Sequence, residues 1–362
     1  MKLTFLVTLF SLLSLAPTFA EEFVLKLLLW EGYAPEKQVH IFEKLMFKKH
    51  GKKIKVEVNN ADSVKEMFDK IKNKQVDIIS PAHCYAKSEK YQFVQKGFLL
   101  PYNLKNMPHF KDMIPALKSS EFVSHQWKVY AMPIAHGPYG LIYNTKYFDV
   151  APNSWSILWD PRLKGKYSIS EDQFEANIYI TALAMGFDKK DFTNLKKIKT
   201  PLFKEKLNDL YHNAGGHWRG VDTVEDLKDK VIATSWGDSR HALKKIGQNW
   251  VFAEPKEGVT GWIDSLYLGH SLKDKPFMKL IAEEWVNYSI SPEFQIDVML
   301  RDIGNDPVNL SIINKITPKE IKAHHLDDPS YFLNNRINWP ELSERNQNWF
   351  DHIWKKVLNS KP

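Results

Sequence analysis

In the first part of the chain, the spacing of apolar positions alternates between that of a strand and that of a helix. Continuous or alternating apolar positions predict strands at 23–30, 54–58 and 76–80, whereas apolar residues at helical spacing predict helices at 35–50 and 64–71. The order strand, helix, strand, helix, strand is typical of a parallel sheet covered by helices.

A second set of elements follows after residue 129. Apolar runs predict strands at 130–133, 140–144, 231–236, 250–253 and 262–268, and helical spacing predicts helices at 174–185, 203–213, 238–246, 276–288, 292–300 and 341–358. No tandem repeat and no low-complexity linker separates the two sets. We therefore expect two α/β lobes joined by strands that cross between them.

The N-terminus indicates export. Lys2 precedes an apolar run at 3–15, and small residues ending at Ala20 lead into Glu21. This is the pattern of a cleavable secretory signal, and the run is shorter than the roughly 20 apolar residues that span a bilayer. No later stretch is long and apolar enough for a membrane helix. We expect residues 1–20 to be removed and the mature protein to be periplasmic.

Charge and composition narrow the choice of partner. The formal net charge is +7, but the lysines are spread along the chain, so solvated helix faces explain them better than a nucleic-acid surface does. Cys84 is the only cysteine, which excludes an internal disulfide. Aromatic residues make up 13% of the chain and include 12 Trp, a composition that suits cation-binding grooves as well as ordinary cores.

The residues that follow the predicted strands are the first candidates for a site. Trp30 to Tyr33 follow the first strand, residues 80–85 follow the third, and Trp236 ends a strand of the second set. In open α/β sheets, ligands bind beyond the carboxyl ends of the strands. We therefore expect these segments to lie near a ligand.

Several segments resemble, in shared order and spacing, the spermidine/putrescine-binding proteins of bacterial ABC transporters, which are family 1 extracellular solute-binding proteins. The segments that carry this resemblance are Trp30-x-x-Tyr33, Asp77-Ile78-Ile79-Ser80-Pro81, Ser154-Trp155-x-x-Leu158-Trp159 with Lys164-Gly165, Asp172-x-x-Glu175, Pro255-Lys256-Glu257-Gly258 and Trp262-x-Asp264-Ser265.

The resemblance implies a type II periplasmic binding protein fold. Each lobe would be a mixed, mostly parallel sheet flanked by helices, with a hinge between the lobes. Lobe 1 would comprise 21–133 plus 264–309, and lobe 2 would comprise 134–263 plus 310–362. The implied function is to capture a polyamine such as spermidine, putrescine or norspermidine and deliver it to an ABC permease. We expect a monomer without cofactor or bound metal.

A polyamine needs carboxylates at its amines and apolar or aromatic walls along its methylenes. Asp264 lies two residues after Trp262, on the same face of a strand. Asp172 and Glu175 are spaced to share one face near a helix start, although acids there also serve as ordinary helix caps. The predicted ligand-binding residues are Trp30, Glu31, Tyr33, His83, Tyr85, Asp172, Glu175, Trp236, Trp262 and Asp264.

The chain departs from the family pattern at the predicted wall. Ala82 and Cys84 stand where the family has Ser and Tyr, Asn305 stands where it has Tyr, and Pro340 follows Trp339 where the family supplies a Gln. These changes leave the length and identity of the ligand open, including a small cation other than a polyamine.

The sequence gives little support to functions other than solute binding. An enzyme is not expected, because His83 and Cys84 are adjacent on an extended segment and point to opposite faces. His212 and His217 have poor spacing for a shared metal. The remaining alternative is a periplasmic polyamine-sensing adaptor that reports ligand to a membrane-bound cyclic-di-nucleotide signalling protein. Capture of the ligand is the same in both roles, and only the partner differs.

Overall fold

The computed structural model describes residues 23–118, 123–237, 239–328, 331 and 336–360, so the predicted signal peptide at 1–20 lies outside the described residues. Among them the strands are β1 (Phe23–Leu29), β2 (Ile54–Asn60), β3 (Ile78–Ile79), β4 (Leu99–Leu100), β5 (Ser124–His125), β6 (Lys128–Val129), β7 (Ala131–Asn144), β8 (Tyr167–Ser170), β9 (Gly216–Trp218), β10 (Ile232–Ser235), β11 (Trp250–Phe252), β12 (Val259–Gly269), β13 (Asp306–Pro307) and β14 (Arg336–Asn338). The helices are α1 (Glu36–His50), α2 (Val64–Lys72), α3 (Pro115–Lys118), α4 (Phe174–Ala184), α5 (Leu195–Ile198), α6 (Pro201–His212), α7 (Val224–Leu227), α8 (Ser239–Lys245), α9 (Pro276–Ser289), α10 (Pro292–Phe294), α11 (Pro318–Ala323), α13 (Glu344–Asn359) and the π-type helix η8 (Gln295–Ile303).

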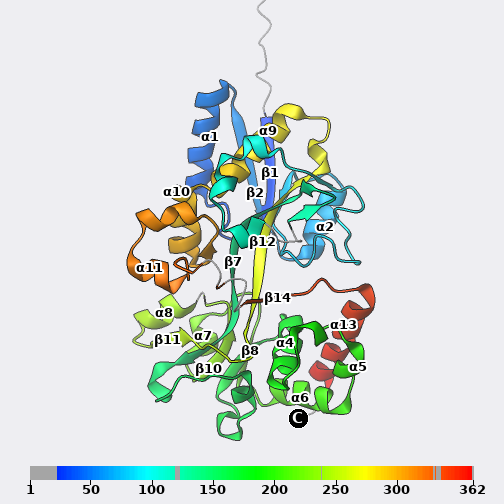
Figure 1. Ribbon diagram of the computed structural model, residues 1–362, viewed down its shortest axis with the longest axis vertical. Helices are drawn as coiled ribbons and strands as arrows, with labels where there is room; N and C mark the ends of the chain where they lie inside the picture. The colour runs from blue at the N-terminus through cyan, green and yellow to red at the C-terminus, as the bar shows by residue number, and fades with distance from the viewer. Residues whose placement is uncertain (1–22, 119–122, 238, 329–330, 332–335, 361–362) are drawn as a thin grey trace, which may run out of the picture.

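Two long antiparallel strands, β7 and β12, run through both lobes and pair with each other from Ala131 and Tyr267 to Tyr139 and Thr260 (Figure 1). On one side the sheet continues through β3, β1 and β2, and on the other through β10, β8 and β9. The two lobes therefore share one continuous sheet, as expected for strands that cross between lobes.

Each lobe has its own hydrophobic core. In the first lobe, β1 pairs in parallel with β2 and β3, and Phe42 of α1 packs edge-on against Trp285 of α9 with ring centroids 5.1 Å apart. In the second lobe, β8 pairs in parallel with β9 and β10, and Tyr179 of α4 packs against Phe350 of α13. Figure 1 shows α1, α2 and α9 around the first lobe and α4, α6 and α13 around the second.

The exact lobe boundaries are a proposal. The predicted division assigns all of 310–362 to the second lobe, yet Ile312 and Leu326 are buried in the first core. Trp339 and Phe350 are buried in the second core. We propose that the last crossing between lobes lies between Leu326 and Trp339.

The structure corrects several boundaries that the apolar pattern predicts. The strands at 130–133 and 140–144 are parts of the single strand β7, which continues through Gly137 and Pro138. The helix at 292–300 is the short α10 followed by the wider η8. Leu45, at a helical apolar position of α1, is 44% exposed because the buried side of α1 is centred on Val39 and Phe42.

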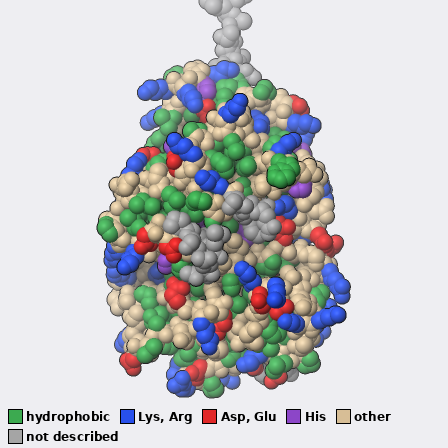
Figure 2. Space-filling model, viewed as in Figure 1, with side chains coloured by type: hydrophobic (Ala, Val, Ile, Leu, Met, Phe, Trp, Pro, Cys, Tyr) green, Lys and Arg blue, Asp and Glu red, His purple; other side chains and the backbone are tan. Residues whose placement is uncertain are grey.

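The surface carries mixed charge. In Figure 2, Lys and Arg side chains are scattered over the visible face among acidic and apolar ones. Within the described part of the chain, no helix has the length and apolar character needed to cross a membrane.

The carboxylate of Asp77 links three segments of the first lobe. One oxygen accepts a hydrogen bond from the Lys26 backbone N–H at 2.9 Å, and the other accepts from the Ser271 hydroxyl at 2.7 Å. The side chain is 7% exposed. In Asp77→Ala the Lys26 N–H loses its acceptor, whereas the Ser271 hydroxyl keeps the Val76 carbonyl oxygen at 3.0 Å, so we expect the free energy of unfolding to fall by about 1–3 kcal/mol in urea denaturation. Asp69→Ala, which removes an exposed ion pair with Lys65, should cost about 0.5 kcal/mol or less, and equal losses in the two variants would contradict this account.

Candidate functional site

Asp264 lies on the crossing strand β12, beside a β-bulge at Asp264 and Ser265. Its carboxylate accepts a hydrogen bond from the Tyr33 hydroxyl at 2.7 Å, and the Trp30 side chain donates a second one. Tyr33 reaches this position through the turn after β1, in which Gly32 has a φ of +86° that favours glycine. Burial raises the pKa of Asp264 to about 7, although the hydrogen bonds from Tyr33 and Trp30 act against the rise.

A second carboxylate, which is partly exposed, comes from the other lobe. Glu175, in the first turn of α4, accepts a hydrogen bond from the Gln347 side chain at 3.0 Å. Burial raises the pKa of Glu175 to about 7, and the bond from Gln347 opposes the rise. The carboxylate borders a cavity of about 20 Å³, enough for roughly one water molecule, whose lining includes Cys84 and Tyr85 of the first lobe.

Cys84 lies within electrostatic range of both carboxylates. Burial raises the pKa of its thiol, and the charges of Glu175 and Asp264 raise it further. A thiol with a raised pKa is a poor nucleophile at neutral pH, so the site does not have an activated cysteine.

Four aromatic rings pack together as an aromatic wall, and one of them, Trp339, borders the small cavity at Glu175. The wall consists of Tyr139, Trp236, Trp262 and Trp339. The ring of Trp236 contacts the other three, with centroids 4.8 Å from Tyr139, 6.1 Å from Trp262 and 5.8 Å from Trp339. Gly137 permits this arrangement, because a Cβ there would come within 2.9 Å of the Trp262 ring.

His83 has a structural environment. It is fully buried, one ring nitrogen pairs with the Trp339 carbonyl oxygen at 2.9 Å, and the other pairs with the Ile263 N–H at 3.2 Å. Burial lowers the pKa of His83 to about 4, so the ring is neutral at pH 7. The ring ties the loop after β3 to β12 and to the segment after β14.

Asp172 and Glu31 lie apart from the other two carboxylates. Asp172 precedes α4, is exposed, and accepts hydrogen bonds from the Ser170 hydroxyl at 2.6 Å and the Gly220 N–H at 2.8 Å. The expected common helix face with Glu175 does not form, because the helix begins only at Phe174. Glu31 is exposed in the turn after β1.

The structure brings the other predicted residues together in three groups: Trp30 and Tyr33 bond to Asp264, Trp236 packs against Trp262, and Tyr85 and Glu175 border one small cavity. Sequence reasoning did not identify Tyr139, Trp339 or Gln347 as site residues. Tyr139 follows a Gly-Pro pair that interrupts the strand pattern, and Gln347 lies in the helical pattern of α13. No spacing rule connects residues so distant in the chain.

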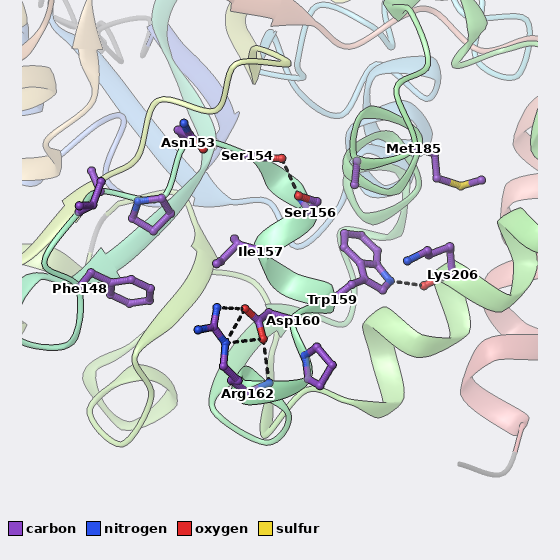
Figure 3. A pocket seen from close by; sticks show the side chains of 15 residues that line it. Phe148, Asn153, Ser154, Ser156, Ile157, Trp159, Asp160, Arg162, Met185 and Lys206 are labelled. Carbon is purple, nitrogen blue, oxygen red and sulfur yellow. Dashed lines mark hydrogen bonds and ion pairs between the residues drawn. The ribbon is translucent and has the colours of Figure 1, made fainter.

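A larger pocket lies elsewhere. It measures about 710 Å³ on the second lobe, next to the end of α4 and to Lys206 of α6, and Figure 3 shows its lining. Asp160 is paired there with Arg162, and the Trp159 indole donates to the Lys206 carbonyl oxygen at 2.9 Å. None of the predicted ligand-binding residues lines it. The volume of this pocket is therefore no argument that a cation binds there.

Asp264→Asn should change how the stability of the ligand-free protein depends on pH. A carboxyl with a raised pKa stabilises the folded state fully below about pH 4, where the unfolded carboxyl is also protonated, and loses this contribution as the pH rises through about 7. Asn cannot ionise. The free energy of unfolding of the variant relative to wild type should therefore increase by roughly 1–3 kcal/mol from pH 5 to pH 8 in urea denaturation.

The free energy of unfolding of Glu175→Gln relative to wild type should also increase from pH 5 to pH 8, because burial also raises the pKa of Glu175. A difference between variant and wild type that does not change over this range would show that the carboxylate is solvated in solution.

The fold resembles those of solved solute-binding proteins. A putative spermidine/putrescine ABC transporter protein of Listeria monocytogenes has a similar structure, with a TM-score of 0.75, 19% identity, and coverage of 93% of this chain and 99% of that one. A GABA receptor gives a TM-score of 0.69 at 18% identity, covering 92% and 96%. These likenesses identify the fold as that of type II periplasmic binding proteins.

The sequence also matches curated proteins. The spermidine/putrescine-binding periplasmic protein of Salmonella typhimurium is 22% identical over 271 residues, which is 74% of each chain. The family model described as bacterial extracellular solute-binding protein matches residues 73–327. The chain therefore belongs to the family of bacterial extracellular solute-binding proteins.

Proposed function

We propose that the protein is exported to the periplasm, captures a small organic amine of the spermidine, putrescine or norspermidine class between its lobes, and delivers it to an ABC permease. The main support is the pair of carboxylates beside the aromatic wall, of which Asp264 is buried and Glu175 is partly exposed. Asp264 bonds to Tyr33 and Glu175 to Gln347, and the only cation that borders the small cavity at Glu175 among the described residues is Lys90, whose charge lowers the pKa of Glu175.

The chemistry of the two carboxylates favours a cation. An ionised carboxylate is costly to bury without a positive partner, and burial raises both pKa values for this reason. An ammonium group would replace the missing positive charge and donate charge-assisted hydrogen bonds. The rings of Trp236, Trp262 and Trp339 would cover the methylenes and stabilise the charge at their faces.

The two carboxylates and Tyr33 lie on different parts of the two-lobed structure. Asp264 lies on a crossing strand, Glu175 on the second lobe, and Tyr33 on the first. A ligand that contacts all three has a higher affinity for the closed arrangement than for an open one, and so shifts the population toward closure. The closed form would be the species that the membrane partner recognises.

The relatives support this ligand class and partner. The matched proteins of Salmonella typhimurium and Escherichia coli are spermidine/putrescine-binding periplasmic proteins. Proteins of this kind bind a solute for transport and do not transform it. The sensing role would use the same capture step, and no feature of the described residues favours it over transport.

Isothermal titration calorimetry of the mature chain, residues 21–362, against putrescine, norspermidine, spermidine and spermine tests the proposal. We expect one-to-one binding of at least one amine. Asp264→Asn should weaken that binding by about 1–3 kcal/mol, because an ammonium loses a charge-assisted hydrogen bond. Asp274→Asn, the same change at an exposed position, should leave the affinity unaltered.

Absence of heat with every amine would refute the proposed ligand class. Amine binding that is equally tight in the wild type and in Asp264→Asn would instead remove Asp264 from the site and leave the ligand class in place.

A further inference from the structure

One loop of the second lobe holds Trp236, the ring that contacts the other three members of the aromatic wall. The loop, residues 219–223, joins β9 to α7. The Trp236 indole donates its N–H to the Gly220 carbonyl oxygen at 3.0 Å, and the Trp236 backbone N–H donates to the Asp222 carboxylate at 3.1 Å. The loop therefore fixes both the backbone and the ring of this residue.

Asp222 anchors one end of the loop. Its side chain is 3% exposed, and both of its oxygens accept from the Ser235 hydroxyl at 2.9 Å. The Ser239 hydroxyl also donates to this carboxylate. Ser235 is the last residue of β10 and Ser239 the first of α8, so the carboxylate bonds to the chain on both sides of Trp236. A buried acceptor with several donors is satisfied, which makes Asp222 a rigid structural anchor.

Asp172 holds Gly220 in the same loop. One carboxylate oxygen of Asp172 accepts the Gly220 N–H at 2.8 Å, and the other accepts the Ser170 hydroxyl at 2.6 Å. Gly220 has a φ of +67°, in the left-handed region that favours glycine. The same glycine offers its carbonyl oxygen to Trp236. Gly220 therefore links the Asp172 carboxylate to the Trp236 indole.

Trp236 and Asp172 differ in what they border. The Trp236 ring lines a cavity of about 220 Å³ beside the aromatic wall. Asp172 is exposed, and it is absent from the described residues that line this cavity or the small cavity at Glu175. The ring, rather than the carboxylate, is therefore the group next to these spaces.

A positive charge also lies near Asp172. The Arg219 guanidinium bonds to the Glu171 carboxylate, and this bond, together with the charge of Asp172, raises the pKa of Arg219. An ammonium placed against Asp172 would therefore lie near a like charge, which opposes a direct contact between this carboxylate and an amine.

We propose that Asp172 is a positioning residue, which sets the orientation of Trp236 through Gly220 and thereby the affinity for an amine. The inference rests on the proposed amine-binding function. It differs from the direct ligand contact that the family resemblance implies for Asp172. A direct contact is lost to the same extent whether or not residue 236 carries an indole N–H, whereas an indirect effect requires that N–H.

A double-mutant cycle separates the two roles. Calorimetry of residues 21–362 uses whichever of putrescine, norspermidine, spermidine and spermine binds most tightly. Asp172→Asn removes one of two acceptor oxygens and should weaken binding about fivefold in the wild type. In the Trp236→Phe background, which lacks the indole N–H, the same change should weaken binding less than about twofold. Asp188→Asn is the matched control, because Asp188 is an exposed aspartate of the same lobe that accepts the Lys190 N–H at 3.1 Å, and it should leave the affinity unaltered.

The indole resonances of the protein labelled with ¹⁵N-tryptophan provide a test without ligand. The Trp236 signal is the one missing in Trp236→Phe. It should shift in Asp172→Asn and stay in place in Asp188→Asn. Gly220→Ala should shift it as well, because this change strains the loop without removing a charge, and the added Cβ would have no heavy atom of the described residues within 4 Å.

Equal weakening by Asp172→Asn in the wild type and in the Trp236→Phe background would overturn the proposal, because this is the result of a direct contact. A Trp236 resonance that stays in place in both Asp172→Asn and Gly220→Ala would also overturn it. If no amine binds, the proposed function itself is refuted, and the indole resonance alone decides whether Asp172 positions Trp236.

Discussion

The pairing of β7 with β12 is the interaction on which the molecule depends. The parallel strands of the first lobe attach to β12 through β3, and those of the second lobe attach to β7 through β10. The segments β13 and β14 add to the same two strands. Gly137, Trp262 and Asp264 are residues of this ladder, so the candidate site is built from the connection between the lobes.

The chemistry of the site is local and differs from that of the surface. The chain has a net charge of +7, and its lysines are dispersed (Figure 2), so the surface offers no long-range attraction to a cation. Asp264 is buried and Glu175 is partly buried, and burial raises the pKa of each carboxyl to about 7. In the proposed binding mode, a cationic ligand and a proton would compete for these carboxylates, so that binding would release protons near neutral pH.

Much of the architecture follows from the sequence, because the period of the apolar positions changes between strand and helix. The first five elements appear in the predicted order, and Asp264 lies near Trp262 because the spacing on β12 requires it. Properties that depend on distant contacts could not be predicted. His83 is at a strand end, where a ligand contact was expected, but its ring nitrogens are used by Trp339 and Ile263.

The environment of Asp172 could not be predicted either, because it also depends on a contact with a distant part of the sequence. Its spacing from Glu175 is helical, but the chain becomes helical only at Phe174, and Asp172 instead holds the Gly220 N–H. Whether the chain is helical at one residue depends on hydrogen bonds with a loop nearly fifty positions later. Tyr139 joins the site because β7 continues through Gly137 and Pro138, which a local pattern treats as a break.

The bulge at Asp264 and Ser265 has a mechanical consequence. A bulge leaves one residue of the partner strand unpaired and lets the ladder bend and twist at that point. Because both strands run from lobe to lobe, a rotation of one lobe against the other concentrates its backbone strain where the ladder is weakest. The residue at that point is Asp264, so a rotation of the lobes would reorient the carboxylate that we propose as the amine-binding group. Opening the protein and releasing its ligand would then be a single motion, without a separate relay between hinge and binding site.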